Sequence, residues 1–217
     1  MKIKTVENLL GELDEDLIWR TKELQAIKSL VEKSSGSDLK LNHRVGIALL
    51  YAHWEGYIKN SSICYILYLS QFSFKYEELT ENFIALSLQG SFKNCANSHK
   101  VSDQCSVVNT LINNLDHETR IRDKVHEEVI PKIAILDSKL FFEILFILGL
   151  KKSPFELKQH LIDNVLVPNR NDVVHGRNPS ITKDEFDKSF KGVTEMLELF
   201  RKEIIIAAKS KSYKKIP

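Results

Sequence analysis

The feature that most constrains the fold is a long apolar run between residues 39 and 72. Within it, the segment VGIALLYAHWEGYIKNSSICYILYLSQF carries apolar side chains on most sides of a helix rather than on a single stripe. A helix of that kind belongs at the centre of a bundle, because each of its faces needs a covering partner. The polar break SSGSD precedes it, and Ser37 or Asp38 can cap its N-terminus.

Helical periodicity also marks segments on both sides of this run. Residues 5–34 place apolar side chains at helical spacing, with acids early and lysines late, as the helix dipole prefers. Residues 138–150 read as a buried helix, and the next helix runs from Pro154 to about 166. Thr182 with Glu185 forms a capping box that opens a last amphipathic helix. Only 8 Gly and 5 Pro are present, and no strand alternation stands out. The sequence therefore predicts an all-α bundle with long core helices.

Three segments lack a clear helical period. Residues 89–104 are polar and poor in apolar side chains, so we expect a surface loop there. Residues 117–131 do not favour one type of structure. The end of the chain, KSKSYKKIP at 209–217, is basic, and we expect it to be frayed in solvent. The alternative is that its lysines contact RNA phosphates while Tyr213 stacks on a base.

Length and composition set the class of protein. The 217 residues fit one domain, which we divide into an N-terminal helix at 5–34, a core bundle at 39–208 and the basic tail at 209–217. A hydrophobic fraction of 43% and a charged fraction of 28% are typical of a soluble protein. The net charge of +2 neither indicates nor excludes a nucleic-acid partner. Without a signal-like leader or an apolar run of about 20 residues, we expect a cytoplasmic protein outside the membrane.

Cysteine and histidine residues do not form a convincing metal site. Cys95, His99 and Cys105, with His117 beyond them, lack the CxxC pair that zinc sites usually contain, so we expect free thiols and no metal. His53 stands beside Trp54 in the apolar helix and is expected to be a hydrogen-bonded core or interface residue. Other histidines have charged neighbours in the sequence, and we expect them to face solvent; they are His43, His117, His126 and His160.

The segment VPNRNDVVHGRNP concentrates charge, amide and imidazole groups between two prolines. Pro168 presets a helical backbone angle, and Gly176 can end a helix in the left-handed conformation, which leaves about two helical turns between them. Arg170 and His175 are five residues apart, or roughly 140° around an ideal helix, so they do not stack on one face. Acting together would require an irregular segment or a second copy of the chain.

The residue types in this segment suit RNA chemistry. A histidine that titrates near neutrality can move the proton of a ribose hydroxyl, and a guanidinium can hold the phosphate through two hydrogen bonds. An Asn beside the Arg can orient either group. The same residues also fit a plain reading, in which they form a polar helix cap and Arg170 makes a surface salt bridge. The residues alone leave both readings open.

Two short motifs resemble a known family. The string RNDVVHG resembles the signature of HEPN-domain ribonucleases, which have an Arg with a polar neighbour, a gap of four to six residues, and then a His that Gly often follows. The string LLYAHWEGYIK at 49–59 is similar to the Trp-Glu-Gly helix of a bacterial HEPN subfamily found near antiviral and toxin–antitoxin genes. The resemblance extends in helix order from 39 to 208.

This resemblance implies an all-helical HEPN-like bundle and a specific activity. It implies metal-independent cleavage of single-stranded RNA or tRNA by the ribose 2′-hydroxyl, without a cofactor, at a cleft between two copies of the chain. A cognate antitoxin or a sensor protein is a further expected partner. The resemblance assigns catalysis to Arg170 and His175 with help from Asn171, leaves Glu55 as a weaker orienting candidate, and suggests RNA contacts for Arg177 and Lys183.

Two other functions remain open at this point. The same bundle with an idle motif would be a module that binds a partner protein. A third possibility is a HEPN domain that binds RNA or a nucleotide without cutting it.

Overall fold

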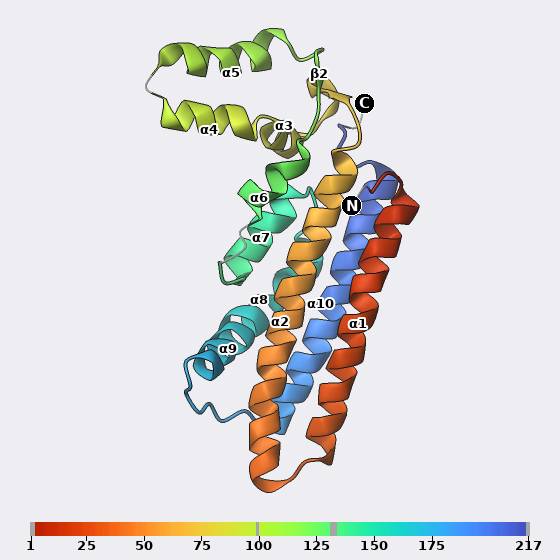
Figure 1. Cartoon of the computed structure of the whole chain (residues 1–217), viewed down its shortest axis with the longest axis vertical. Coiled ribbons are helices and arrows are strands. Elements are labelled where there is room, and N and C mark those ends of the chain that lie inside the picture. Colours follow the sequence, from red (N-terminus) through yellow and green to blue (C-terminus); the bar gives the residue numbers. More distant parts are fainter. Residues whose placement is uncertain (1–2, 99, 131–133, 216–217) are drawn as a thin grey trace.

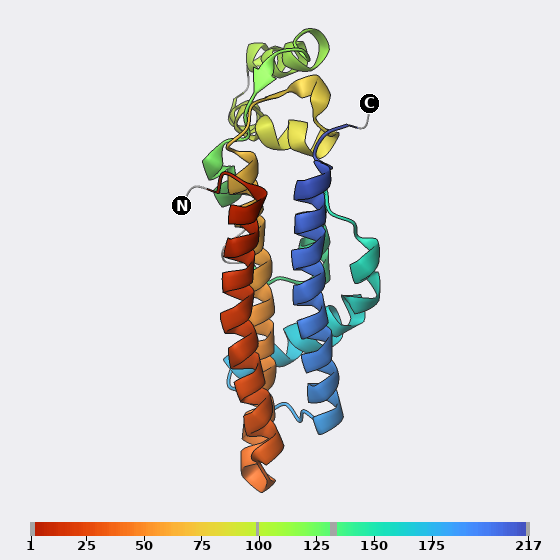
Figure 2. The ribbon, with the colours of Figure 1, turned by 90° about the vertical axis from the view of Figure 1, so that its right-hand side faces the viewer.

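Three long helices run side by side and form a bundle in the computed structural model, which describes residues 3–98, 100–130 and 134–215 (Figures 1 and 2). These are α1 (Val6–Lys33), α2 (Gly36–Leu69) and α10 (Lys183–Ser210). Helix α1 runs antiparallel to α2 and α10, so the start of α1 and the end of α10 lie at the same end of the bundle (Figure 1). The all-α prediction is confirmed, apart from two strands of two residues each.

Helix α1 buries a single stripe against α2 and α10. Its N-cap Thr5 accepts a hydrogen bond from the backbone N–H of Asn8, as a capping side chain does. The buried positions recur every three or four residues, which is the spacing that the sequence predicts: Leu9, Leu13, Leu17, Arg20, Leu24, Ile27 and Val31. Arg20 is the exception to their apolar character. It occupies a core position on the stripe between Leu17 and Leu24.

Helix α2 is buried on most of its faces, as expected for a central helix. Its start differs from the prediction, because the N-cap is Ser35 rather than Ser37 or Asp38. Gly36 adopts a φ of 58°, a left-handed conformation that glycine tolerates, and this lets the chain reverse at once after α1. The helix therefore begins earlier than the polar residues suggest.

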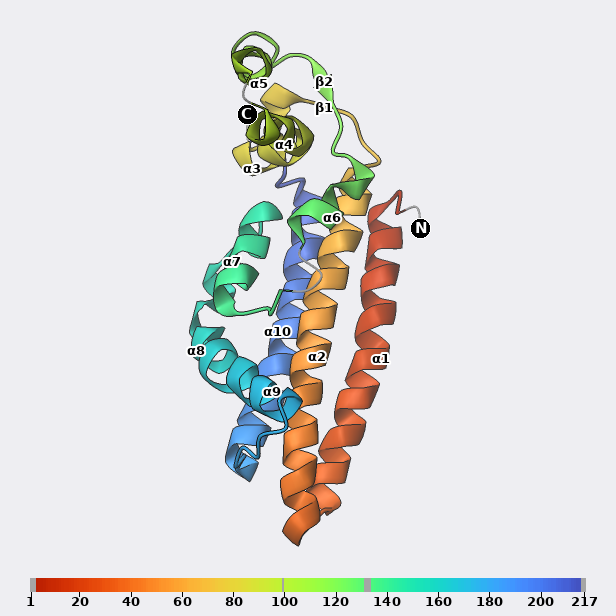
Figure 3. The same ribbon diagram turned by 60° about the vertical axis from the view of Figure 1, so that its left-hand side comes forward.

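A second layer of shorter helices covers one side of α2 and α10 (Figure 3). Aromatic rings fill the space between the layers. Phe141 packs edge-on against Phe155 with 5.1 Å between ring centres, and it also contacts Phe200 of α10 at 6.0 Å. The layer consists of α7 (Ser138–Ile147), the 3₁₀ helix η3 (Ser153–Lys158), α8 (Gln159–Leu161), the π-helical turn η4 (Ile162–Leu166) and α9 (Val167–Val174).

Residues 74–129 form a small head beyond the end of the bundle (Figure 1). Its two antiparallel strands pair Phe74 with Thr119 and Lys75 with Glu118. The elements of the head are β1 (Phe74–Lys75), η1 (Tyr76–Glu78), α3 (Glu81–Ser87), α4 (Gln89–Asn97), α5 (Val101–Asn113), β2 (Glu118–Thr119), η2 (Asp123–Val125) and α6 (His126–Val129).

The prediction of a surface loop at 89–104 is wrong. Helix α4 occupies most of that segment, and α5 begins at Val101, so the two helices form a hairpin that projects from the head (Figure 1). Helix α4 has few apolar residues and buries none of them, so its segment has little of the apolar character on which the prediction of helices relied. A polar segment without proline can still be helical when a neighbouring helix pairs with it.

The prediction of a frayed C-terminal tail is also wrong for the part that the structure describes. Tyr213 is only 3% exposed and packs edge-on against Phe74 and Phe83. Lys214 forms an ion pair with Glu78 at 3.0 Å and continues the backbone pairing at Leu79. The tail thus ties α10 to the head, and the Tyr213 ring is not available to stack on a base. Burial raises the pKa of Tyr213 to about 12.

In the described part of the chain, no helix combines the length and the apolar character needed to cross a membrane.

Candidate functional site

The candidate motif lies at the end of an irregular helical run on the second layer. Helix α9 follows the π-helical turn η4 without a break, so the chain does not leave the helical conformation at Pro168. Pro168 lacks a backbone N–H and cannot complete the usual α-helical hydrogen bond to the preceding turn. A π turn inserts an extra residue at this point and often marks functional positions in helices. The irregularity sets the direction in which α9 leaves the core.

A glycine cap ends α9 and places His175. The N–H of Gly176 donates to the carbonyl of Val173 at 3.1 Å, and the N–H of Arg177 donates to the carbonyl of Asp172 at 2.8 Å. This paired pattern is the Schellman motif, in which the residue after the cap is left-handed. Gly176 meets that demand with a φ of 71°. His175 is therefore the C-cap residue, and its side chain is exposed.

Arg170 is held on the inner side of α9 by two neighbours. Its Nη1 donates to Oδ1 of Asn171 at 3.0 Å. Its guanidinium carbon lies 5.5 Å from the centre of the Tyr51 ring on α2, within the range of a cation–π contact. Arg170 is half-buried, whereas His175 is exposed. The expected association of Asn171 with Arg170 is thus present as a hydrogen bond.

Tyr51 connects Arg170 to the rest of the core. Its hydroxyl accepts a hydrogen bond from the backbone N–H of Leu136 at 2.8 Å. Burial raises the pKa of Tyr51 to about 12, and the negative charge of Glu55 acts in the same direction. The phenol therefore stays neutral. Sequence reasoning missed Tyr51, although it lies four residues before Glu55 and so on the same face of α2.

Glu55 lies on the face of α2 that is directed towards this cluster. Its carboxylate pairs with Lys59 one turn further on, with 2.6 Å between Oε1 and Nζ, and Lys59 also donates to the carbonyl of Ala134. Among the described residues, Glu55 contacts neither Arg170 nor His175. Its negative charge raises the pKa of Tyr51, and Tyr51 contacts Arg170.

The two residues expected to contact RNA lie at the same end of the bundle. Arg177 is 72% exposed at its side chain and forms an ion pair with Asp172 at 2.9 Å. Lys183 is exposed at the first position of α10. A further basic residue that sequence reasoning missed, Arg44 of α2, donates from Nη1 to Oδ1 of Asn178. Nothing in the sequence alone pairs Arg44 with the loop after α9.

Each residue of the Trp-Glu-Gly motif has a separate structural task. Trp54 is fully buried and packs edge-on against Tyr51 and Phe141. Glu55 is directed towards the candidate site. Gly56 lets α1 approach closely, because a Cβ on it would lie 2.6 Å from Nη1 of Arg20. The three residues therefore contribute to the core, to the surroundings of the site and to the close packing of α1 on α2, respectively.

The structure confirms the expectations for some of the remaining histidines and contradicts the expectation for His43. His53 is buried as expected, and its Nε2 lies 3.0 Å from Oε2 of Glu23. The prediction that His43 faces solvent is wrong, because it is 4% exposed and stacks on Phe186. Residues with mostly polar sequence neighbours can still lie on the buried face of a helix. His126 is half-buried, whereas His117 and His160 are exposed.

The structure also describes most of the residues considered for zinc. Cys95 and Cys105 are free thiols, and His99 lies outside the described residues. Among the residues that the structure describes, no cluster of three histidine, cysteine, aspartate or glutamate side chains has the arrangement to hold a metal ion.

Comparison with known proteins gives one result that covers nearly the whole chain. The sequence profile of the family described as RiboL-PSP-HEPN matches residues 15–205. Neither the curated proteins nor the solved structures contain a significant match. The matched range includes α2 with its Trp-Glu-Gly motif, the whole of α9 and most of α10. The chain therefore belongs to the RiboL-PSP-HEPN family of HEPN-domain proteins.

Proposed function

We propose that this HEPN protein is a metal-independent endoribonuclease, acting on single-stranded RNA or tRNA in bacterial toxin–antitoxin or antiviral defence. The observation that carries the proposal is the arrangement on α9. Arg170 is half-buried and held by Asn171 and Tyr51, and His175 projects into solvent from the C-cap of the same helix. A fixed cation can bind a phosphate, and an exposed imidazole at the end of the same helix can transfer protons.

The chemistry follows from these two groups. The 2′-oxygen of the ribose forms a bond to phosphorus, and the bond from phosphorus to the 5′-oxygen breaks. One imidazole accepts the proton of the 2′-hydroxyl, and another donates a proton to the leaving 5′-oxygen. Arg170 stabilises the charge on the phosphate oxygens. The products are a 2′,3′-cyclic phosphate and a free 5′-hydroxyl.

A second copy of the chain completes the site in this proposal. Each chain supplies one His175, whereas the reaction uses a base and an acid. The exposure of His175 supports this arrangement, because a partner subunit can approach it without any rearrangement of the core. Arg177, Lys183 and Arg44 then line the approach of the RNA strand, where their charges attract phosphates.

The direct test is cleavage of single-stranded RNA in the presence of EDTA. We expect the parent protein to produce cyclic-phosphate ends, and His175→Ala to lower the rate by about a hundredfold or more. Arg170→Ala should have a similar effect. His160→Ala is the matched control, since His160 is also exposed but lies on α8. Equal rates for His175→Ala and the parent, or no cleavage by the parent, would overturn the proposal.

A second candidate function is a non-catalytic module that binds a partner protein, such as an antitoxin or a sensor. The observation that favours it is an apolar stripe on α5. Val101, Val108 and Ile112 are 67%, 52% and 69% exposed, and they follow the spacing of one helix face. The test is capture of the product of a neighbouring gene, with Val108 and Ile112 substituted by Ser. If these substitutions abolish capture and the parent protein cleaves no RNA, partner binding replaces RNA cleavage as the proposed function.

A further inference from the structure

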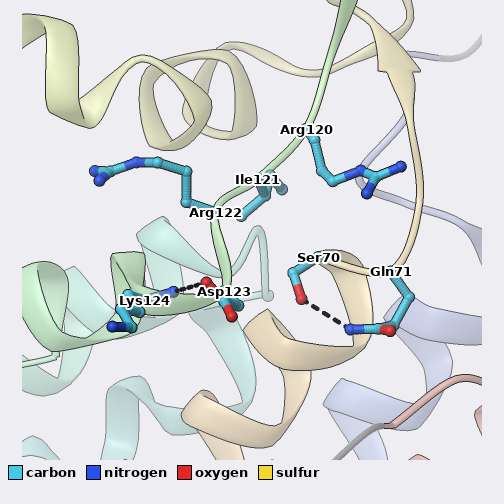
Figure 4. Close-up of a pocket in the computed structure, with 7 residues that line it drawn as sticks. All are labelled: Ser70, Gln71, Arg120, Ile121, Arg122, Asp123 and Lys124. Carbon is cyan, nitrogen blue, oxygen red and sulfur yellow. Dashed lines mark hydrogen bonds between the residues drawn. The ribbon is translucent and has the colours of Figure 1, made fainter.

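A cavity of about 490 Å³ lies where the bundle meets the head (Figure 4). It opens between the end of α2 and the segment that joins β2 to η2. A volume of this size is within the range of ligand pockets. Basic side chains dominate its charged lining, which consists of Ser70, Gln71, Arg120, Ile121, Arg122, Asp123 and Lys124.

The positive charge of this pocket is only partly compensated. Arg122 forms an ion pair with Glu128 at 3.1 Å. Arg120 donates to the hydroxyl of Ser73, and no carboxylate among the described residues pairs with Arg120 or with the ammonium of Lys124. Oδ1 of Asp123 accepts a hydrogen bond from the backbone N–H of Lys124. Two cations at the pocket thus remain free to bind an anion.

The fold holds the segment that carries these cations in place. Ile121 is fully buried and anchors the segment, so the arginines on either side of it extend away from each other over the pocket (Figure 4). Ser70 and Gln71 both donate to the carbonyl of Leu67 near the end of α2. This matters because free carbonyls at a helix C-terminus carry partial negative charge and would repel an anion.

We propose that this pocket binds phosphate groups of the RNA strand on which α9 acts. The inference rests on the proposed function. Helix α2 connects the two places, since Tyr51 contacts Arg170 and Ser70 lines the pocket. Tyr51 and Ser70 are 19 positions apart along α2 and its C-cap, or about 28 Å at 1.5 Å per residue. A strand with stacked bases advances about 3.4 Å per nucleotide, so about eight nucleotides span this distance.

A free nucleotide is the other source of the same phosphate chemistry. We favour the strand because Arg120 and Arg122 extend to opposite sides of the pocket, as a backbone that continues past it would require (Figure 4). A mononucleotide would need one converging set of cations instead. The experiment separates these two sources.

The test measures RNA binding in His175→Ala protein, so that the result does not depend on cleavage. Arg120→Gln with Lys124→Gln should weaken binding of a strand of about 20 nucleotides by about tenfold at moderate salt. It should also lower the slope of log K against log salt by about 1.4, since each contact with single-stranded nucleic acid contributes about 0.7. Binding of a strand of about four nucleotides, which cannot span both places, should change little.

The matched control removes two exposed lysines from α1 and α10, as Lys22→Gln with Lys202→Gln. An equal loss of affinity in this control, or no loss in the pocket variant, would show that the pocket has no special part in RNA binding. If the pocket variant loses ATP binding but keeps RNA binding, the site belongs to a free nucleotide and the inference is wrong. If RNA affinity and its salt dependence change as expected although the parent never cleaves RNA, the pocket does bind RNA and the proposed nuclease function is wrong.

Discussion

The guanidinium of Arg170 lies over the ring of Tyr51, with 5.5 Å between the guanidinium carbon and the ring centre. This contact joins α9 to the central helix α2 and sets the position of the candidate phosphate-binding group. The hydroxyl of the same tyrosine accepts a hydrogen bond from Leu136. One aromatic side chain therefore contacts α9 through its ring and the segment before α7 through its hydroxyl.

A double-mutant cycle should detect this contact. We expect Tyr51→Leu and Arg170→Gln to show a coupling free energy of about 0.5–1 kcal/mol in urea unfolding, which is typical of a partly exposed cation–π pair. A cycle with Tyr51→Phe keeps the ring and should show much weaker coupling. Tyr51→Phe alone should still cost about 1–3 kcal/mol, because it leaves the buried N–H of Leu136 without its acceptor. Additive effects in the Leu cycle would refute the contact.

Gly176 should be required for the end of α9. Its φ of 71° is unfavourable for a residue with a Cβ, although no atom lies within 4 Å of where that Cβ would be. Gly176→Ala should therefore destabilise the protein by about 1 kcal/mol through backbone strain alone. The corresponding fall in melting temperature is about 2–4 °C for a chain of this size. Gly176→Asn should be milder, since Asn tolerates this conformation, and a larger loss for Asn would contradict the explanation.

Gly56 should tolerate no side chain, for a different reason. A Cβ there would lie 2.6 Å from Nη1 of Arg20, which is 8% exposed and bonded to Asp16. We expect Gly56→Ala to cost about 1–3 kcal/mol in unfolding free energy, as overpacking does. Gly11→Ala on the exposed face of α1 is the control. It meets nothing within 4 Å and should stabilise the helix by up to about 1 kcal/mol. Similar effects at both glycines would disprove the close approach.

His53 should make stability sensitive to mild acid. Burial lowers the pKa of His53, and the charge of Arg20 acts in the same direction. Glu23 opposes this shift, but its side chain is 57% exposed and water screens it. The unfolded chain therefore takes up a proton at a higher pH than the folded chain does, and stability falls as pH drops through about 6.5.

The measurement is the unfolding free energy between about pH 7 and pH 5, compared between the parent and His53→Gln. The parent should lose more stability than the variant over this range. Carboxyl groups with a lowered pKa, such as those of Glu78 and Glu185, lose their contribution only below their ordinary value of 4.5, so they do not interfere. If the unfolding free energies of the two proteins change with pH in parallel, His53 does not contribute to the pH dependence of stability.

Local signals in the sequence predicted the helices that have a strong apolar period or a distinct cap. The capping box of Thr182 and Glu185 is present at the start of α10, and the stripe of α1 is buried as expected. The sequence did not reveal α4, because its segment is mostly polar and contributes no buried residue to the core. The sequence also did not predict that Tyr213 packs against the head, because this contact depends on Phe74 and Phe83 in distant parts of the chain.

By itself, the sequence determined the helical class, the central place of α2, the position of the Arg-Asn-His motif and the glycine that ends its helix. These features depend on neighbours within a few residues, whose spacing fixes helix faces and caps. Only the tertiary structure decided that Tyr51 contacts Arg170, that the charge of Glu55 raises the pKa of Tyr51, and that Arg120 and Lys124 lie beside a cavity at the end of α2. Such contacts join segments far apart in the chain, and no local period encodes which side chains meet when helices pack.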